Sequence, residues 1–252
     1  MIATEGVSAM NIQRLVFCLA FLLASPTMAS PTMASVLSYE ASLGSLPDAQ
    51  GWTIVESGAA SPTPTISSGL LQQGMTSFTG YQYWTGNPGS LNFADAPIAV
   101  DVRLHIVSAS LNVPAGRAGY AFGLIDDIGR YAIAFISSSE VFLVNDQFTT
   151  KSSIVDFDST DGFHDYHLVA GPGGLTLSID GNLLVSQSLG TLSAEGHVAW
   201  FGDGTAGGNN QSELQFLSVG TVGVAEPVSL GLFGLALGGL VAVGRRNARK
   251  SA

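Results

Sequence analysis

Between residues 35 and 222, apolar and polar residues alternate in short runs, and spacing typical of helices is almost absent. The clearest run is Ile98–Val107, where every second residue is Ile, Val or Leu and the residues between include Asp101, Arg103 and His105. A period of two is typical of a strand with one face buried and the other in water. Similar runs recur about every 8–12 residues between clusters of Gly, Ser, Asn, Asp and Pro, which favours an all-β domain.

The same pattern predicts further strands at Arg117–Ile125, Tyr131–Ser137, Glu140–Val144, Leu175–Ile179, Asn182–Ser188, His197–Gly202 and Glu213–Val222. Asp180 and Gly181 separate two of these runs and form a two-residue hairpin signal, because tight hairpin turns favour residues that tolerate positive φ. Roughly a dozen short strands in one domain predict a jelly-roll β-sandwich of two sheets.

The N-terminal segment, residues 1–34, is predicted to be a secretory signal peptide. Its apolar stretch Leu15–Ala24 is too short to span a membrane and follows a basic residue. A Ser-Pro-Thr-Met-Ala sequence then occurs twice, which offers signal peptidase a site after Ala29 and another after Ala34. The start of the true signal peptide is placed at Met10, because the preceding residues contain an acidic side chain and add nothing to a basic leader.

The C-terminal segment, residues 223–252, has the composition of a membrane-directed signal. An uncharged run, Val228–Gly244, follows Ala225-Glu226-Pro227 and precedes the basic pair Arg245 and Arg246. At about 1.5 Å per residue this run makes a helix of roughly 25 Å, slightly shorter than a bilayer core of about 30 Å. The basic residues behind it place the C-terminus in the cytoplasm.

This tail resembles the PEP-CTERM sorting signal of Gram-negative bacteria, with Ala225 in place of the first proline. The resemblance implies an exosortase-like processing enzyme acting near Glu226 and Pro227, transient anchoring in the inner membrane, and delivery to the cell surface. It also implies an association with exopolysaccharide and biofilm. A simple C-terminal membrane anchor is the alternative interpretation of the tail.

The segment between the two ends, residues 35–222, is long enough for one sizeable core. It carries four basic residues against seventeen carboxylates, a net charge of −13, which repels nucleic-acid phosphates and makes nucleic acid an unsuitable partner. Its sequence has no cysteine, since Cys18 lies in the predicted signal peptide. An exported domain without disulfides must be stabilised by its hydrophobic core.

Three segments of this domain resemble concanavalin A-like and laminin-G-like domains. They are the aromatic and histidine-rich strand Phe163–Leu168 with the hairpin Leu175–Gly181, the opening Tyr39–Gly44 with Gly51–Val55, and the late segment Phe201–Thr205. The resemblance implies a sandwich fold and gives no guide to activity, because this fold carries lectins, hydrolases and inert spacers alike.

Catalytic motifs are missing from the sequence. Hydrolases of this fold share a strand with the pattern Glu-x-Asp-x-x-Glu, and this pattern does not occur in the sequence. The Gly-x-Ser-x-Gly motif of a nucleophile elbow does not occur either. The sequence therefore predicts a non-enzymatic surface or matrix protein that associates with polysaccharide. A secreted carbohydrate-active hydrolase on the same scaffold and an inert structural spacer are the alternatives.

Aromatic residues supply the candidate sugar-binding site. Tyr81, Tyr83, Trp84 and Trp200 have the flat apolar rings on which sugars stack. At strand period Tyr81 and Tyr83 share one face and Trp84 takes the other. Filling of the core is the alternative role for the same side chains, because the sequence does not say which face is exposed.

No cofactor is expected from the sequence, although Ca²⁺ is an alternative at two oxygen-rich turns. Asp126 and Asp127 lie at one turn, and Asp203 and Asn209 flank the other. Calcium prefers such oxygen ligands, while ordinary turn chemistry explains the same residues.

The densest ionisable cluster is His164, Asp165 and His167. On a strand Asp165 and His167 share one face and His164 takes the other, so only two of the three are placed to serve one metal ion. A strand surface in contact with water explains the cluster without a metal.

Overall fold

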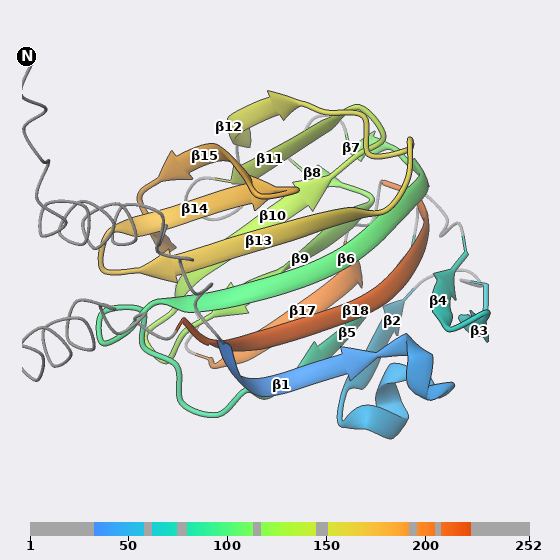
Figure 1. Ribbon diagram of the computed structural model, residues 1–252, viewed down its shortest axis with the longest axis horizontal. Coiled ribbons are helices and arrows are strands. Elements are labelled where there is room, and N and C mark those ends of the chain that lie inside the picture. Colours follow the sequence, from blue (N-terminus) through green and yellow to red (C-terminus); the bar gives the residue numbers. More distant parts are fainter. Residues whose placement is uncertain are drawn as a thin grey trace, which may run out of the picture. The chain divides into compact units, whose positions relative to one another are not determined.

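Two antiparallel β-sheets account for nearly all the secondary structure of the residues that the structure describes, as Figure 1 shows. The computed structural model describes residues 33–57, 62–74, 80–112, 117–144, 151–191, 196–204 and 208–222. All of them belong to one unit, Met33–Gly223. Most of the predicted signal peptide and the whole predicted C-terminal tail lie outside the described residues. Within the described ranges no helix is long and apolar enough to span a bilayer.

Sheet A has eight strands. Its order is β15 (Asn182–Gln187), β14 (Gly174–Ile179), β13 (His164–Gly171), β6 (Ile98–Ala109), β18 (Asn210–Val222), β4 (Leu70–Gln73) and β3 (Thr65–Ser67), with β1 (Met33–Glu40) also paired to β18. The long strand β18 pairs with β6 along one edge. Along its other edge it pairs with β4 near its start and with β1 over the rest of its length. The first and last strands of the described domain are therefore neighbours in sheet A.

Sheet B also has eight strands. Its order is β12 (Lys151–Asp156), β11 (Glu140–Val144), β10 (Arg130–Ile136), β9 (Tyr120–Ile125), β17 (Val198–Asp203), β5 (Tyr81–Gly86) and β2 (Thr53–Ser57), with β16 (Gly190–Thr191) paired to β10. Two 3₁₀ turns, η1 (Ala41–Leu43) and η2 (Pro47–Gln50), and the small hairpin β7 (Leu111–Asn112) with β8 (Arg117–Ala118) complete the described elements.

The predicted all-β sandwich of two sheets is confirmed, and several strands agree closely with the alternation of the sequence. Strand β11 has the predicted limits, and β6 extends the predicted run by two residues. The predicted hairpin also forms, since Asp180 (φ 51°) and Gly181 (φ 77°) both take the left-handed conformation that a two-residue turn requires.

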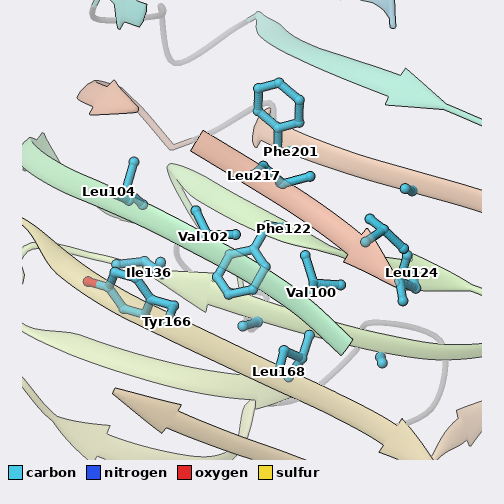
Figure 2. Close-up of a cluster of buried hydrophobic side chains, with 14 of the residues drawn as sticks. Val100, Val102, Leu104, Phe122, Leu124, Ile136, Tyr166, Leu168, Phe201 and Leu217 are labelled. Carbon is cyan, nitrogen blue, oxygen red and sulfur yellow. The ribbon is translucent and has the colours of Figure 1, made fainter. Parts of the chain in front are cut away.

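The core lies between the facing sheets, where alternate residues of each strand point inward. Figure 2 shows Val100, Val102 and Leu104 of β6 opposite Phe122 and Leu124 of β9. These side chains are buried, whereas the intervening β6 residues remain partly exposed. Burial of apolar surface on this scale is the main source of stability for a domain whose described residues include no cysteine.

Aromatic rings fill one part of this core around Phe201. Its ring lies 4.9 Å from that of Trp52, 5.2 Å from that of Trp84 and 5.9 Å from that of Tyr39, measured between centroids. Trp84 is therefore a core residue with 1% of its surface exposed, and its assignment to a sugar-stacking site was wrong. The alternation placed Trp84 on the opposite face from Tyr81 and Tyr83 correctly, but it did not identify which face is buried.

Replacing Phe201 by Ala should lower the free energy of unfolding by about 3–5 kcal/mol, because the change leaves a cavity among three aromatic rings. Urea unfolding followed by fluorescence measures the change. The control is Leu43→Ala at a side chain that is 70% exposed, which should change stability by less than about 0.5 kcal/mol. Equal losses in the two variants would contradict this account of the core.

Candidate functional site

The outer face of sheet B, which points away from the core, carries a second hydrophobic cluster. Six of its residues are buried, with Ile125 and Trp200 packed against them: Ala121, Tyr131, Ile133, Phe135, Phe142 and Val144. In β11 the alternation is clear, since Val141 and Leu143 belong to the core and Phe142 to the outer cluster. Sheet B is therefore apolar on both faces, which is unusual for an antiparallel sheet with one face in water.

Aromatic rings form a continuous row across this outer face. Ring centroids are 5.6 Å apart for Tyr81 and Tyr83, 5.8 Å for Tyr83 and Trp200, and 6.4 Å for Trp200 and Phe135. Phe142 extends the row at 5.6 Å from Phe135. Three of the four predicted sugar-stacking residues thus lie together, and only Trp84 does not.

Two glycines on this face, Gly123 on β9 and Gly204 after β17, allow close approaches that a side chain would block. Gly123 is the register partner of Trp200 on one side and of Ile133 on the other, and it presents no side chain between them. A Cβ atom at this position would lie 2.2 Å from the carbonyl oxygen of Ala132. The β10 backbone therefore approaches β9 too closely for a side chain at position 123. The indole of Trp200 takes the space beside Gly204 instead, where a Cβ atom would lie 2.5 Å from it.

Two adjoining hollows along these rings make a groove, which we call the sheet B groove. The first, of about 270 Å³, is lined by Tyr83, Thr85, Arg117, Ile125, Phe135, Val198, Trp200 and Gly204. The second, of about 380 Å³, shares Thr85 and Val198 with the first and is also lined by Gly51, Thr53, Gly86, Asn87, Gly196 and His197. The groove therefore changes from aromatic at one end to polar at the other.

A histidine–carboxylate pair stands at the polar end. His197 Nδ1 lies 3.2 Å from Asp127 Oδ1. Asp127 is held in place by the hydroxyl of Ser90 and by the backbone N–H of Leu91, which donates over 3.1 Å. These hydrogen bonds, with the nearby His197, lower the pKa of the Asp127 carboxyl and keep it ionised. A carboxylate at Nδ1 fixes the tautomer of the imidazole and makes Nε2 the basic nitrogen.

The carboxylates at positions 126 and 127 accept hydrogen bonds from groups of the protein itself. Asp126 is fully buried and accepts five hydrogen bonds, from the backbone N–H groups of Phe93, Ile128 and Arg130 and from two nitrogens of the Arg130 guanidinium. Its charge is already balanced by Arg130. Both carboxylates are therefore engaged with donors inside the protein, and calcium at this turn stays a prediction.

The second predicted turn has a different environment. Asp203 points between the sheets and is fully buried, while Asn209 binds the strand end through its backbone, which pairs with Ser110. Among the described residues no group of three or more His, Cys, Asp or Glu side chains is placed to hold a metal ion. The sequence-based prediction missed the neighbours of Asp203, because Gln73, Gln82 and Asn210 come from distant strands.

The cluster of His164, Asp165 and His167 forms ion pairs at the surface of sheet A. Asp165 binds Arg103 at 2.7 Å and His167 binds Asp101 at 2.5 Å, in both cases across the β13–β6 ladder. His164 lies between Asp161 and Asp180, at 2.6 and 2.8 Å. Both histidines of this cluster are therefore paired with a carboxylate. The outer face of sheet A is charged, whereas that of sheet B is aromatic.

No protein-family model matches this chain, and no curated protein does either. Solved structures do resemble it. A carbohydrate esterase from the Shiga toxin-encoding bacteriophage phi24B is 17% identical, with a TM-score of 0.52 over 76% of this chain and 100% of that one. A protein of unknown function from Shewanella oneidensis MR-1 is 12% identical, with a TM-score of 0.50 over 89% and 98% of the two chains.

A prokaryotic β-1,3-1,4-glucanase from a mouse hindgut metagenome has a TM-score of 0.46 at 11% identity, over 73% of this chain and 99% of that one. At these identities the likeness shows the fold alone. It nevertheless corrects the prediction of a non-enzymatic protein, because solved structures with this sandwich include a carbohydrate esterase. The absence of local catalytic motifs is weak evidence against an enzyme, because a β-sandwich brings the residues of a site together from separate strands.

The His167–Asp101 pair should make stability depend on pH. The hydrogen bond to Asp101 raises the pKa of His167 above its ordinary value of 6.5, against the opposing effect of burial. The stabilisation is therefore complete below about pH 6.5 and fades as the pH rises through the folded-state pKa. Urea unfolding should show a stability difference between wild type and His167→Gln that is largest near about pH 5.5 and smallest near about pH 8.5. A difference that grows with pH would contradict this sign.

Proposed function

We propose that this protein is an exported carbohydrate-active enzyme, an ester hydrolase, that holds a polysaccharide chain in the sheet B groove. The observation that carries the proposal is the set of partly exposed rings of Tyr81, Tyr83 and Trp200, which lie in contact with one another beside a histidine–carboxylate pair. The rings support binding of an extended sugar chain, and the histidine–carboxylate pair supports catalysis at one point along that chain.

The shape and composition of the groove support a glycan rather than a nucleic acid or a lipid. Tyr83 and Trp200 are partly exposed and lie in one aromatic surface, which suits the apolar faces of sugar rings. Thr53, Thr85 and Asn87 at the polar end supply hydroxyl and amide groups for sugar hydroxyls. The net charge of −13 on residues 35–222 disfavours phosphate backbones and anionic lipids.

His197 is the proposed general base. With Nδ1 bound to Asp127, its Nε2 takes a proton from water, which then attacks the acyl carbon of an ester on the sugar. The imidazolium returns the proton to the sugar oxygen as it leaves, so the products are a carboxylic acid and a free sugar hydroxyl. Asp127 stabilises the imidazolium between these two steps.

Ester hydrolysis fits the groove better than cleavage of a glycosidic bond. Glycosidases use two carboxyl groups about 5–10 Å apart on either side of the bond. None of the described residues that line the groove is Asp or Glu. The nearby Asp127 is already engaged with Ser90, Leu91 and His197, which suits an orienting role rather than that of a nucleophile.

Export is the part of the proposal that rests on sequence alone. Cleavage of the signal peptide after Ala29, the earlier site, leaves strand β1 complete from Met33 onwards. The PEP-CTERM-like tail then passes the protein through the inner membrane to an exosortase-like enzyme and on to the cell surface. Its substrate there is a polysaccharide of the matrix. The resemblance of residues 35–222 to concanavalin A-like domains is consistent with binding of a polysaccharide.

Replacing Trp200 by Ala should weaken binding of soluble O-acetylated polysaccharides about thirtyfold, equivalent to about 2 kcal/mol, since it removes the central ring of the row. Affinity electrophoresis of the purified full-length protein measures the change. Phe163→Ala is the matched control, because it removes a ring beside His105 and Arg103 on the opposite sheet. Loss of binding in the control but not in Trp200→Ala would contradict the location of the site.

Replacing His197 by Gln should lower the rate of acetate release from the same polysaccharides at least about 100-fold, since the general base is lost, while binding stays intact. His105→Gln is a closely matched control, because His105 Nδ1 also lies 3.2 Å from a carboxylate, that of Glu213. It should release acetate at the wild-type rate. Release of reducing ends without acetate by the wild type would instead identify a glycosidase.

A further inference from the structure

Asn87 lies at the polar end of the sheet B groove, in the same hollow as the proposed general base. Strand β5 ends at Gly86, which is paired with Ala199 near the start of β17. Asn87 therefore leaves β5 at the same end of the sheet at which His197 leads into β17. Both residues line the hollow of about 380 Å³. Their side chains are thus placed to contact the same small group of a bound substrate.

The amide of Asn87 has a fixed orientation. Its Oδ1 accepts a hydrogen bond of 2.8 Å from the backbone N–H of Gly89, two residues further along the chain, which forms an Asx turn. Gly89 has a φ of 81°, a conformation that favours glycine at this turn. The other end of the amide, Nδ2, carries two N–H donors. Because Asn87 is exposed, these donors are accessible to a ligand in the hollow.

The segment that follows Asn87 is attached to the carboxylate that orients His197. The hydroxyl of Ser90 and the backbone N–H of Leu91 both donate to the carboxylate of Asp127. In the opposite direction, the backbone N–H of Asp127 donates to the carbonyl oxygen of Leu91 over 3.0 Å. One short segment therefore carries the amide and also holds the partner of the base. Such an arrangement fixes both groups before a substrate binds, which avoids the cost of ordering them during the reaction.

We propose that Asn87 is a further catalytic residue, and that its Nδ2 donates a hydrogen bond to the carbonyl oxygen of the ester as that oxygen becomes negatively charged. This inference rests on the proposed ester hydrolysis and adds the group that stabilises its oxyanion. Preorganised donors aimed at a developing oxyanion are among the largest contributions to acyl-transfer catalysis. One N–H of the amide serves the ester, and the second remains for a sugar hydroxyl.

The reaction is balanced without a further reactant. The oxygen of water bonds to the acyl carbon while its proton passes to Nε2 of His197, and the electron pair of the C=O bond moves onto the carbonyl oxygen. When the C=O bond forms again, the bond to the sugar oxygen breaks, and the imidazolium gives its proton to that oxygen. Asn87 keeps its own protons throughout and only strengthens its hydrogen bond at the oxyanion stage.

The composition of the hollow favours Asn87 over its neighbours for this role. Among the described residues that line it, Asn87 and His197 are those whose side chains carry N–H donors. His197 is already required as the base. Thr85 directs its hydroxyl proton to the backbone oxygen of Thr53, over 3.4 Å. Asn87 is therefore the side chain in this hollow that is best placed to bind the carbonyl oxygen.

Steady-state kinetics of acetate release test the role, with the purified full-length protein and a soluble O-acetylated polysaccharide. Asn87→Ala should lower kcat about 100-fold or more, because one oxyanion donor typically contributes about 10²–10³ to kcat. KM should rise less than about tenfold, since a neutral hydrogen bond to a sugar hydroxyl is worth no more than that. The control Asn182→Ala, which removes an exposed amide on β15 of sheet A, should keep the wild-type kcat and KM. A raised KM at an unchanged kcat would leave only the sugar contact and would overturn the proposal.

Asn87→Asp separates catalysis from folding. Its carboxylate keeps an acceptor for the N–H of Gly89, so the turn should persist and the melting temperature should change by about 2 °C or less. The negative charge beside the oxyanion should lower kcat at least as far as Asn87→Ala does. A wild-type kcat in Asn87→Asp, together with an inactive His197→Gln, would overturn the role of Asn87 and leave the proposed hydrolase intact. A wild-type protein that releases no acetate would overturn both.

Discussion

The alternation of side chains across sheet B is the constraint on which the rest of the structure depends. Consecutive residues on β5 and β17 point to opposite faces, so Trp84 and Phe201 enter the core while Tyr83 and Trp200 face outward. A shift of register by one residue would exchange the two sets. The same backbone arrangement therefore creates both the aromatic core and the aromatic groove, and neither forms without the other.

The two sheets differ in what they present to their surroundings. Sheet A carries ion pairs on its outer face, including Arg103–Asp165 and His105–Glu213, which are typical of a solvated surface. Sheet B carries buried apolar side chains on its outer face, together with partly exposed rings and a histidine held by Asp127. The partly exposed rings of Tyr83 and Trp200 are the apolar surface that remains open on this face, and they support it as the face on which a ligand lies.

Much of the fold was predictable because strand signals are local. The limits of β11, the hairpin at Asp180 and the opposite faces of Tyr83 and Trp84 all follow from a period of two and from turn chemistry. Which face is buried did not follow, since that depends on how the sheets pack. For this reason Trp84 was assigned to the surface although it packs on Phe201.

The site itself was only partly predictable, because its residues meet through non-local register. Trp200 on β17 packs on Phe135 of β10, across β9, and His197 meets Asp127 from a turn some 70 residues earlier in the chain. Asp126 and Asp127 form an oxygen-rich turn in sequence, but their oxygens are occupied by donors from Phe93, Arg130 and Ser90. Gln82 lies at an inward-facing strand position, and such a polar residue was the one sign in the sequence that polar side chains are buried around Asp203.

We propose the outer face of sheet B as the surface on which this protein binds polysaccharide. A crystal structure of the protein with a bound O-acetylated oligosaccharide tests it most directly. Sugar rings should stack along Tyr83 and Trp200, with the acyl group next to a water molecule that is hydrogen-bonded to His197 Nε2. An oligosaccharide bound over the charged face of sheet A, with the sheet B groove left free of sugar, would contradict it.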